Sequence, residues 1–179
     1  MDLSSPDIAV LDWLHHHLVP HSVPFLQGVS NSTTMISITM TVAVVVVSVI
    51  RRSRPLRMKF VTLVMLLLLV AGLSQGLKAL IHRDRPFDSL SDIEKLSTGG
   101  DSSFPSGHTL EAFAMATALS LMFRQRRIIL PVFAWALLVA YSRVALGVHY
   151  PSDVLAGMIL GALSGWTAWY VLHKNLDTV

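Results

Sequence analysis

The chain has 179 residues, of which only 14% are charged, and its mean hydropathy is +0.58. A soluble domain carries about 25% charged residues, so this composition argues against a soluble protein. The chain contains no cysteine, which excludes disulfides and thiolate metal sites. The sequence pI of about 9.6 could indicate nucleic-acid binding. The basic residues lie beside apolar blocks, however, as in membrane proteins, so we expect no nucleic-acid partner.

The N-terminal segment, residues 6–27, mixes apolar side chains with histidines and prolines. It is too polar to cross a bilayer easily, so we expect an amphipathic helix that lies in the membrane interface or re-enters it. A metal site from His15, His16 and His17 is disfavoured, because neighbouring positions on a helix point about 100° apart. The first 20 residues also lack the basic and then apolar pattern of a cleavable signal peptide.

Five apolar segments follow, each close to the roughly 20 residues that a membrane-spanning helix needs. They are residues 30–50, 60–78, 106–123, 128–146 and 153–172. The last one contains Gly157, Gly161 and Gly165, a spacing that lets two helices approach closely. We therefore expect one all-α domain over residues 1–179, an integral membrane helical bundle with five transmembrane helices plus the N-terminal interfacial or re-entrant helix.

The charges between the apolar segments predict how the chain is oriented. Nine of the fourteen basic residues lie in the links 51–59 and 124–127 or at Lys174. With five spans they fall on one side, which the positive-inside rule places in the cytoplasm. Ten of the eleven acids lie at or near the other side. We expect a multi-pass protein of the cell (inner) membrane whose links 82–105 and 146–153 face the periplasm or the exterior.

Six ionisable residues collect at the external ends of the predicted spans. They are Lys78, Arg85, His108, Arg143, His149 and Asp153. Charged groups at membrane depth are costly and are therefore candidates for function. Lys78, Arg85 and Arg143 can bind the oxygens of a phosphate group, for which arginine offers a forked pair of donors. Ser106 and Gly107 add backbone N–H groups at a helix N-terminus, which favours anions.

The two histidines and the acid supply the other parts of a phosphoryl transfer. His149 can attack phosphorus when the carboxylate of Asp153, four residues later, orients its ring. His108 can protonate the leaving oxygen. In such reactions positioning and electrostatic stabilisation provide most of the catalysis. The pattern therefore predicts phosphoryl transfer at the external face.

These residues form three motifs: Lys78-x6-Arg85-Pro86, Pro105-Ser106-Gly107-His108 and Ser142-Arg143-x5-His149-x3-Asp153. The set resembles the signature of the type 2 phosphatidic acid phosphatase family, which vanadium haloperoxidases and glucose-6-phosphatase share. The resemblance implies a phosphohistidine at His149, oriented by Asp153, while His108 protonates the leaving group and then activates water. It implies a reaction without metal or other cofactor. It also implies a phosphate site made by Lys78, Arg85, Ser106, Gly107 and Arg143. Membrane members usually have six core helices, and here segment 6–27 stands in place of the first.

The external site and the surrounding spans favour a lipid of the bilayer as the substrate. Undecaprenyl diphosphate is the first choice, followed by phosphatidylglycerophosphate, phosphatidate and lipid A 1-phosphate. A haloperoxidase is disfavoured because those relatives are typically soluble. The alternative of another class is a transporter or flippase for a phosphorylated lipid or sugar. A nucleophile and an acid argue against it, because binding alone needs neither.

Three features near the motifs have open roles. Arg83 and Asp84 are expected to be local solvated charges, although either could contact a substrate head group. Glu111 lies three residues after His108, and it could tune that histidine, contact substrate or bond a neighbouring helix. The link 87–104 is rich in Ser, Gly, Asp and Glu, and we expect a mobile loop over the site.

Overall fold

The computed structural model describes residues 6–18 and 20–177, with side chains up to residue 174. In this part of the chain every regular element is helical. Residue 19, inside the predicted N-terminal helix, lies outside the described residues. The elements are α1 (Pro6–His16), the 3-10 turn η1 (Pro20–Ser22), α2 (Val23–Asn31), α3 (Thr33–Ile50), α4 (Arg54–Ile81), α5 (Pro86–Ser89), α6 (Gly107–Phe123), α7 (Arg126–Ala145) and α8 (Pro151–Asp177).

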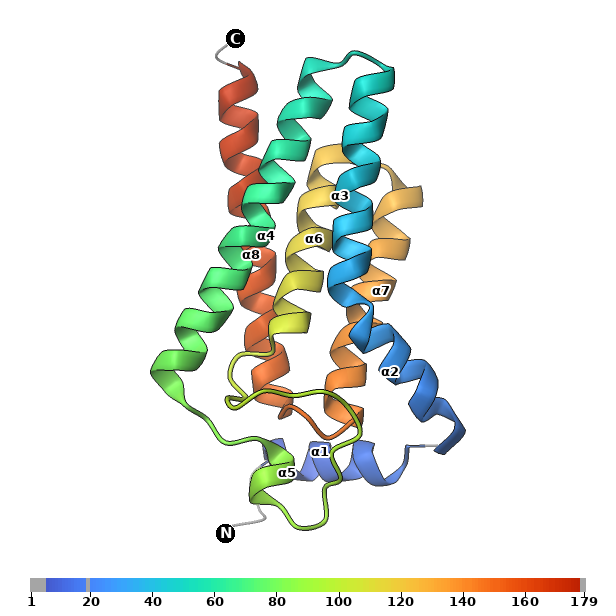
Figure 1. Cartoon of the computed structure of the whole chain (residues 1–179), viewed down its shortest axis with the longest axis vertical. Helices are drawn as coiled ribbons and strands as arrows, with labels where there is room; N and C mark the ends of the chain where they lie inside the picture. Colours follow the sequence, from blue (N-terminus) through green and yellow to red (C-terminus); the bar gives the residue numbers. More distant parts are fainter. Residues whose placement is uncertain (1–5, 19, 178–179) are drawn as a thin grey trace.

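Helix α6 forms the centre of the bundle, and α3, α4, α7 and α8 pack around it (Figure 1). Most of its side chains are buried, including the fully buried Leu110 and Met115. Alanine occupies many of the other buried positions of α6, so neighbouring helices can approach its backbone. A short central helix therefore fixes where the longer helices lie.

Helix α8 touches α6 through its glycines. A β-carbon on Gly157 would lie 2.8 Å from the carbonyl oxygen of Ser106, and one on Gly161 would collide with that of Leu110. One on Gly165 would lie 2.9 Å from the β-carbon of Thr117. No side chain fits at these distances, so the predicted close approach is confirmed. It holds the start of α8 beside the start of α6.

Four helical segments among the described residues are long and apolar enough to cross a membrane. They are Thr33–Ile50, Arg54–Ser89, Arg126–Ala145 and Pro151–Lys174. Large apolar side chains such as Ile38, Met65 and Leu155 are exposed on the outside of the bundle, where a soluble protein would be polar. The chain is thus a multi-pass membrane protein. The predicted span 106–123 corresponds to the central helix α6, which is not among these four, and the count of five spans stays a prediction.

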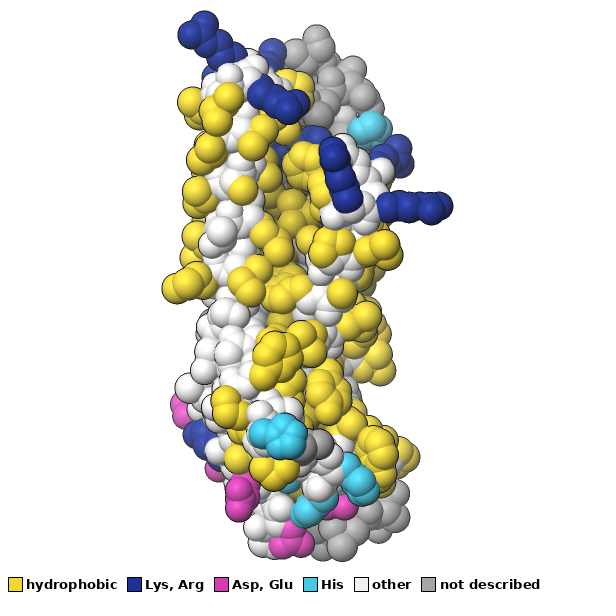
Figure 2. Space-filling view, turned by 90° about the vertical axis from the view of Figure 1, so that its right-hand side faces the viewer, with side chains coloured by type: hydrophobic (Ala, Val, Ile, Leu, Met, Phe, Trp, Pro, Cys, Tyr) yellow, Lys and Arg dark blue, Asp and Glu magenta, His cyan; other side chains and the backbone are white. Residues whose placement is uncertain are grey.

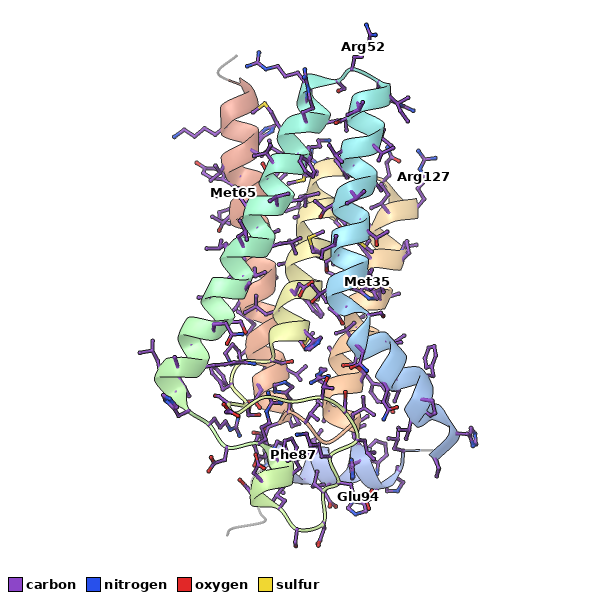
Figure 3. All side chains as sticks on the ribbon, in the orientation of Figure 1. Met35, Arg52, Met65, Phe87, Glu94 and Arg127 are labelled. Atoms are coloured by element: carbon purple, nitrogen blue, oxygen red, sulfur yellow. The ribbon has the colours of Figure 1, made fainter. Side chains whose placement is uncertain are left out.

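Charges of opposite sign gather at opposite ends of the described molecule (Figure 2). In Figure 3, Arg52 and Arg127 lie at one end of the bundle, and Phe87 and Glu94 lie at the other. The helices cross the length of the bundle in alternating directions, which brings the arginine-rich links 51–59 and 124–127 together. The predicted separation of charge is therefore confirmed for the described residues, and the cell compartment of each end stays a prediction.

The segment 6–27 is not the single helix that we expected. Helix α1 ends at His16, and α2 begins only at Val23 after the turn at Pro20. Proline has no N–H and fixes its φ angle, so a helix does not continue through that turn. Helix α1 lies across the end of the bundle, whereas α2 leads into α3 (Figure 1). Leu11 of α1 is buried, while Trp13 is 60% exposed. Contact of this segment with the membrane interface stays a prediction.

Candidate active site

All six predicted ionisable residues lie at the acidic end of the bundle. Lys78 is in the last turn of α4 and Arg143 in the last turn of α7. His108 and Asp153 are in the first turns of α6 and α8. The links between these helices carry Arg85 and His149. Because α4 and α7 run opposite to α6 and α8, residues far apart in the sequence meet at one end.

His149 and Asp153 are both buried, and their separation shows how they interact. The His149 Nδ1 atom lies 3.7 Å from Asp153 Oδ2. That distance is too long for a direct hydrogen bond. The hydroxyl of Ser103 lies between them: it is 3.4 Å from His149 Nδ1 and donates to Asp153 Oδ2. The carboxylate therefore acts on the ring through its charge and through Ser103.

The surroundings of His149 favour a neutral ring with its proton on Nδ1. Burial lowers the pKa of His149 to about 3, because the imidazolium would lose its hydration. Asp153 acts in the opposite direction, and the positive charges of Arg143 and Arg85 add to the effect of burial. Arg85 Nη1 can only donate, and it lies 3.4 Å from His149 Nε2. The neutral ring therefore carries its lone pair on Nε2.

Arg85 ties two loops to the site. Its Nε donates to Gly100 O at 2.5 Å and its Nη2 to Ser102 O at 3.0 Å. Its Nη1 donates to Val148 O, the residue before His149, at 2.7 Å. The link 87–104 therefore lies over the site, as expected, and is bonded to a buried guanidinium. The mobility of this loop stays a prediction.

Arg143 is the second buried arginine of the site. Its Nη1 donates to the Ser30 hydroxyl, and its Nη2 donates to Thr98 O at 2.9 Å. Its Nε is buried and has no hydrogen-bond partner among the described residues. An unpaired buried donor of a charged group is costly, so an anion that accepts from this Nε would be bound favourably.

The N-terminus of α6 completes the cluster. A β-carbon on Gly107 would lie 2.9 Å from the Ser74 hydroxyl and 4.0 Å from Lys78 Nζ, so the lysine reaches this helix end. Ser106 N donates to Asp153 O at 3.1 Å, which joins the starts of α6 and α8. The Ser106 hydroxyl lies 2.9 Å from that of Thr109. Three of the predicted phosphate-binding residues, Lys78, Ser106 and Gly107, thus lie together at one helix N-terminus.

A groove of about 340 Å³ leads away from this cluster between α3, α4 and α6. Its polar end includes Lys78 and His108. The rest of its lining is mainly apolar, with Ile38, Leu67, Leu68, Val70 and Ala71. Glu111 also lines it, and its Oε2 accepts a hydrogen bond from the Thr34 hydroxyl of α3 at 2.8 Å. Of the three roles left open for Glu111, the bond to a neighbouring helix is confirmed; the others stay predictions.

Arg83 and Ser103 belong to the site although the sequence did not indicate it. Arg83 Nη1 donates to Asp153 Oδ1 at 2.6 Å, and Nη2 donates to Asp7 Oδ2 at 2.8 Å. For Arg83 the expectation of a local solvated charge was therefore wrong, whereas Asp84 is exposed as expected. Asp7 and Arg83 lie 76 residues apart, so no spacing in the sequence could have connected them. The position of Ser103, two residues before Pro105 of the second motif, was the only available hint.

The rings of the three consecutive histidines diverge. His15 Nδ1 pairs with Ala145 O at 3.0 Å. The rings of His16 and His17 turn back to carbonyl oxygens of their own helix. This geometry agrees with the expectation that they do not converge on one ion.

Known proteins resemble the chain in both sequence and fold. Residues 59–177 match the sequence model of the PAP2 superfamily. Lipid A 4'-phosphatase of Bacteroides thetaiotaomicron is 36% identical over 104 residues, which cover 55% of this chain and 46% of that protein. Undecaprenyl-diphosphatase BcrC of Bacillus subtilis is 37% identical over 82 residues, which cover 46% and 42%. The chain thus spans less than half the length of these curated relatives.

Two crystal structures have the same arrangement of helices. LpxE of Aquifex aeolicus matches with a TM-score of 0.80 and 25% identity over 92% of this chain and 94% of that one. A PAP2-type phosphatidylglycerolphosphate phosphatase of Bacillus subtilis matches with a TM-score of 0.76 over 98% and 89%. Its identity is 22%, so it shows the fold alone.

Proposed function

Since the chain belongs to the PAP2 superfamily, we propose that it is a membrane phosphatase that hydrolyses a lipid phosphate or diphosphate through a phosphohistidine intermediate. The observation that carries this proposal is the buried His149, with Asp153 near one ring nitrogen and Arg85 beside the other, in surroundings that lower the pKa of the ring. Two relatives bear the names lipid A 4'-phosphatase and undecaprenyl-diphosphatase, and both names support hydrolysis of a lipid phosphate.

In the first step, His149 Nε2 attacks the phosphorus and the bond from phosphorus to the lipid oxygen breaks. His108 donates a proton to that oxygen as it leaves. Asp153 stabilises the positive charge that develops on the ring of His149. Five groups bind the oxygens of the phosphoryl group: Lys78, Arg85, Ser106, Gly107 and Arg143. Arg143 Nε and the N-terminus of α6 are suited to this because they present donors to an anion.

In the second step, water replaces the histidine. His108 has lost its proton in the first step and now takes one from water. The resulting hydroxide attacks the phosphorus, the P–N bond breaks, and inorganic phosphate leaves. His108 is then protonated again and His149 is neutral, so both residues return to their starting state. The residues of the chain provide every proton transfer in this scheme.

The groove beside His108 supports a lipid substrate. Its apolar part lies between α3 and α4, two of the helices with membrane-spanning composition, and its polar part reaches Lys78. A chain anchored in the bilayer would lie along the apolar part with its phosphate at the cluster. We place the site at the periplasmic or extracellular face of the cell (inner) membrane, because the arginine-rich links lie at the opposite end. Undecaprenyl diphosphate is the first choice of substrate.

Phosphate release by the purified protein in detergent tests this function. A panel of undecaprenyl diphosphate, phosphatidylglycerophosphate, phosphatidate and lipid A 1-phosphate would rank substrates by kcat/KM. His149→Ala should lower kcat by about 1,000-fold or more, because removal of a nucleophile leaves only binding and electrostatic effects. The exposed His21 provides the control: His21→Ala should keep normal activity.

The intermediate gives a second measurement. Acid-stable and acid-labile phosphoenzyme can be separated after a rapid quench, and phosphohistidine is the acid-labile form. His108→Ala should accumulate it with a substrate whose leaving group needs no proton, because release by water is slowed. Activity that survives His149→Ala, or that is lost on treatment with EDTA, would contradict the proposal. Binding of lipid phosphate without hydrolysis would favour the transporter.

A further inference from the structure

Arg83 and Asp7 extend the hydrogen-bonded chain that begins at His149. Asp153 uses its Oδ2 to accept from Ser103 and from Tyr150 N, the latter at 3.0 Å. Its Oδ1 accepts from Arg83 Nη1 at 2.6 Å. The other end of the guanidinium, Nη2, donates to Asp7 Oδ2 at 2.8 Å. His149 is thus connected to helix α1 through the Ser103 hydroxyl, a carboxylate, a guanidinium and a second carboxylate.

Asp7 is held in this position by the first turn of α8. Ser152 N donates to Asp7 Oδ1 at 2.7 Å, and the Ser152 hydroxyl donates to Asp7 Oδ2 at 2.5 Å. Arg83 Nη1 also donates to the Ser152 hydroxyl oxygen at 2.6 Å. Because Ser152 precedes Asp153, Asp7 and the catalytic carboxylate are fixed by adjacent residues of one helix turn.

Arg83 is fixed as firmly as Asp7. Its guanidinium carbon lies 4.0 Å from the centre of the Tyr150 ring, a cation–π contact. Its carbonyl oxygen accepts from Ser103 N at 2.8 Å, so the same residue positions the hydroxyl that bridges His149 and Asp153. Burial lowers the pKa of Arg83, but the hydrogen bonds to Asp7 and Asp153 and the charges of both carboxylates together raise it by more. The guanidinium is therefore charged throughout the working pH range.

The net charge of Asp153, Arg83 and Asp7 decides whether Asp153 can stabilise a positive charge on His149. Asp153 is completely buried, and a buried carboxylate without a partner is strongly unfavourable. Arg83 supplies the partner, but a single cation would cancel the negative charge that His149 needs beside it. Asp7 adds a second negative charge, so that the three groups together carry −1. That charge can stabilise the cationic ring that forms when His149 attacks phosphorus.

We propose that Asp7 and Arg83 are positioning residues of the reaction. Helix α1 therefore contributes a residue, Asp7, to the active site. Arg83 orients Asp153, and Asp7 orients Arg83 and restores the negative charge next to His149. This inference rests on the proposed role of His149 as the nucleophile. It predicts an effect on the rate at which His149 is phosphorylated, with little effect on substrate binding, because neither residue lines the groove.

Asp7→Asn is the decisive variant, since it keeps the shape of the side chain and removes its charge. The rate of phosphoenzyme formation in a single turnover should fall about 10- to 100-fold, the range seen when the hydrogen-bond partner behind a metal-ligating histidine is removed. The KM should change little. Asp7→Glu should recover part of the rate because the charge returns. Arg83→Gln should have the largest effect, and Arg83→Lys should lie between it and the wild type.

Asp12→Asn is the matched control: it makes the same change on the same helix. The Asp12 carboxylate is 58% exposed and pairs only with the neighbouring His16 among the described residues. The single-turnover rate of the Asp12→Asn variant should equal that of the wild type. The amplitude of the phosphoenzyme burst counts the folded, competent sites, so it separates loss of folding from loss of rate.

Two results would overturn this inference alone. In the first, Asp7→Asn is phosphorylated at the wild-type rate and only the amplitude of its phosphoenzyme burst is reduced. Helix α1 would then have only a structural role. The second is an equal loss of rate in Asp12→Asn. In both cases His149→Ala would remain inactive and the proposed function would stand. If His149→Ala is active, the proposed function itself fails.

Discussion

At the scale of single residues, His149 has different partners at its two ring nitrogens. Nδ1 faces an acceptor, the Ser103 hydroxyl, while Nε2 faces the Arg85 guanidinium, which can only donate. This asymmetry selects one tautomer of the neutral ring. It leaves the lone pair on Nε2, the nitrogen that faces Arg85. Protonation of the ring would remove that lone pair and place a third positive charge beside Arg85 and Arg143.

The ring of His149 should stay neutral in mildly acidic solution. Burial lowers its pKa to about 3, so a normal histidine transition near pH 6.5 is expected to be absent. In the unfolded chain this residue takes up a proton below about pH 6.5. Its contribution to folding stability is thus complete above that pH and is lost as the pH falls toward the folded-state value.

Nitrogen NMR of labelled histidine rings in detergent micelles would measure this. The signals of His149 are identified as those missing from His149→Gln. They should keep neutral-ring shifts at pH 5, because the pKa of His149 lies near 3. A His149 midpoint near 6.5 would contradict the prediction.

At the scale of helices, the contact between α6 and α8 sets the distance between the site residues. It places the start of α8, with Asp153, beside the start of α6, with His108. The glycines of α8 make this possible because the carbonyl oxygens of α6 occupy the space of their missing side chains. Without a hydrophobic effect between helices in lipid, such close packing provides much of the association energy.

Gly161→Ala should therefore destabilise the protein. Its new methyl group would collide with Leu110 O and lie 3.0 Å from Ala114 N, both of them backbone atoms of a central helix. Such overpacking typically costs about 1–3 kcal/mol. Gly72→Ala is the control, because a β-carbon there meets nothing within 4 Å. Alanine should stabilise that helix by about 0.5–1 kcal/mol. Thermal unfolding in detergent would compare them, and equal Tm values for the two variants would refute this packing role.

At the scale of the whole molecule, the distribution of charge predicts an orientation. Arginine-rich links lie at one end and the acidic residues lie at the other, with exposed apolar side chains between them (Figure 2). Positive charge is retained in the cytoplasm during insertion. The end with His149 should therefore face away from the cytoplasm, where it meets lipids of the outer leaflet.

Single cysteines can test this orientation directly, because the chain contains none. Ser91→Cys lies in the exposed part of the loop over the site, and Gln125→Cys lies in the exposed link between α6 and α7. A membrane-impermeant maleimide should label Ser91→Cys in intact cells or spheroplasts. Gln125→Cys should be labelled only after permeabilisation. The reverse pattern would show that the site faces the cytoplasm.

Local patterns in the sequence determined the apolar segments, the separation of charge and the catalytic motifs. The glycine spacing predicted the contact of α8 with another helix, because three residues four apart share one face. The spacing of His149 and Asp153 likewise predicted that they lie close together, and the PAP2 resemblance of the motifs is confirmed by the family match. Each of these properties depends on residues that are close in the sequence or on hydropathy. It can therefore be predicted without knowledge of the tertiary structure.

The tertiary structure alone decided how the carboxylate of Asp153 is supported. Ser103 bridges it to His149, and Arg83 joins it to Asp7, which lies 76 residues from Arg83 in the sequence. It also decided that segment 6–27 divides into two helices and that α1 crosses the end of the bundle. These contacts depend on which helix ends meet in space. The hydrogen bonds between these side chains follow from the packing of the helices. That packing cannot be predicted from the periodicity or the local spacing of the sequence.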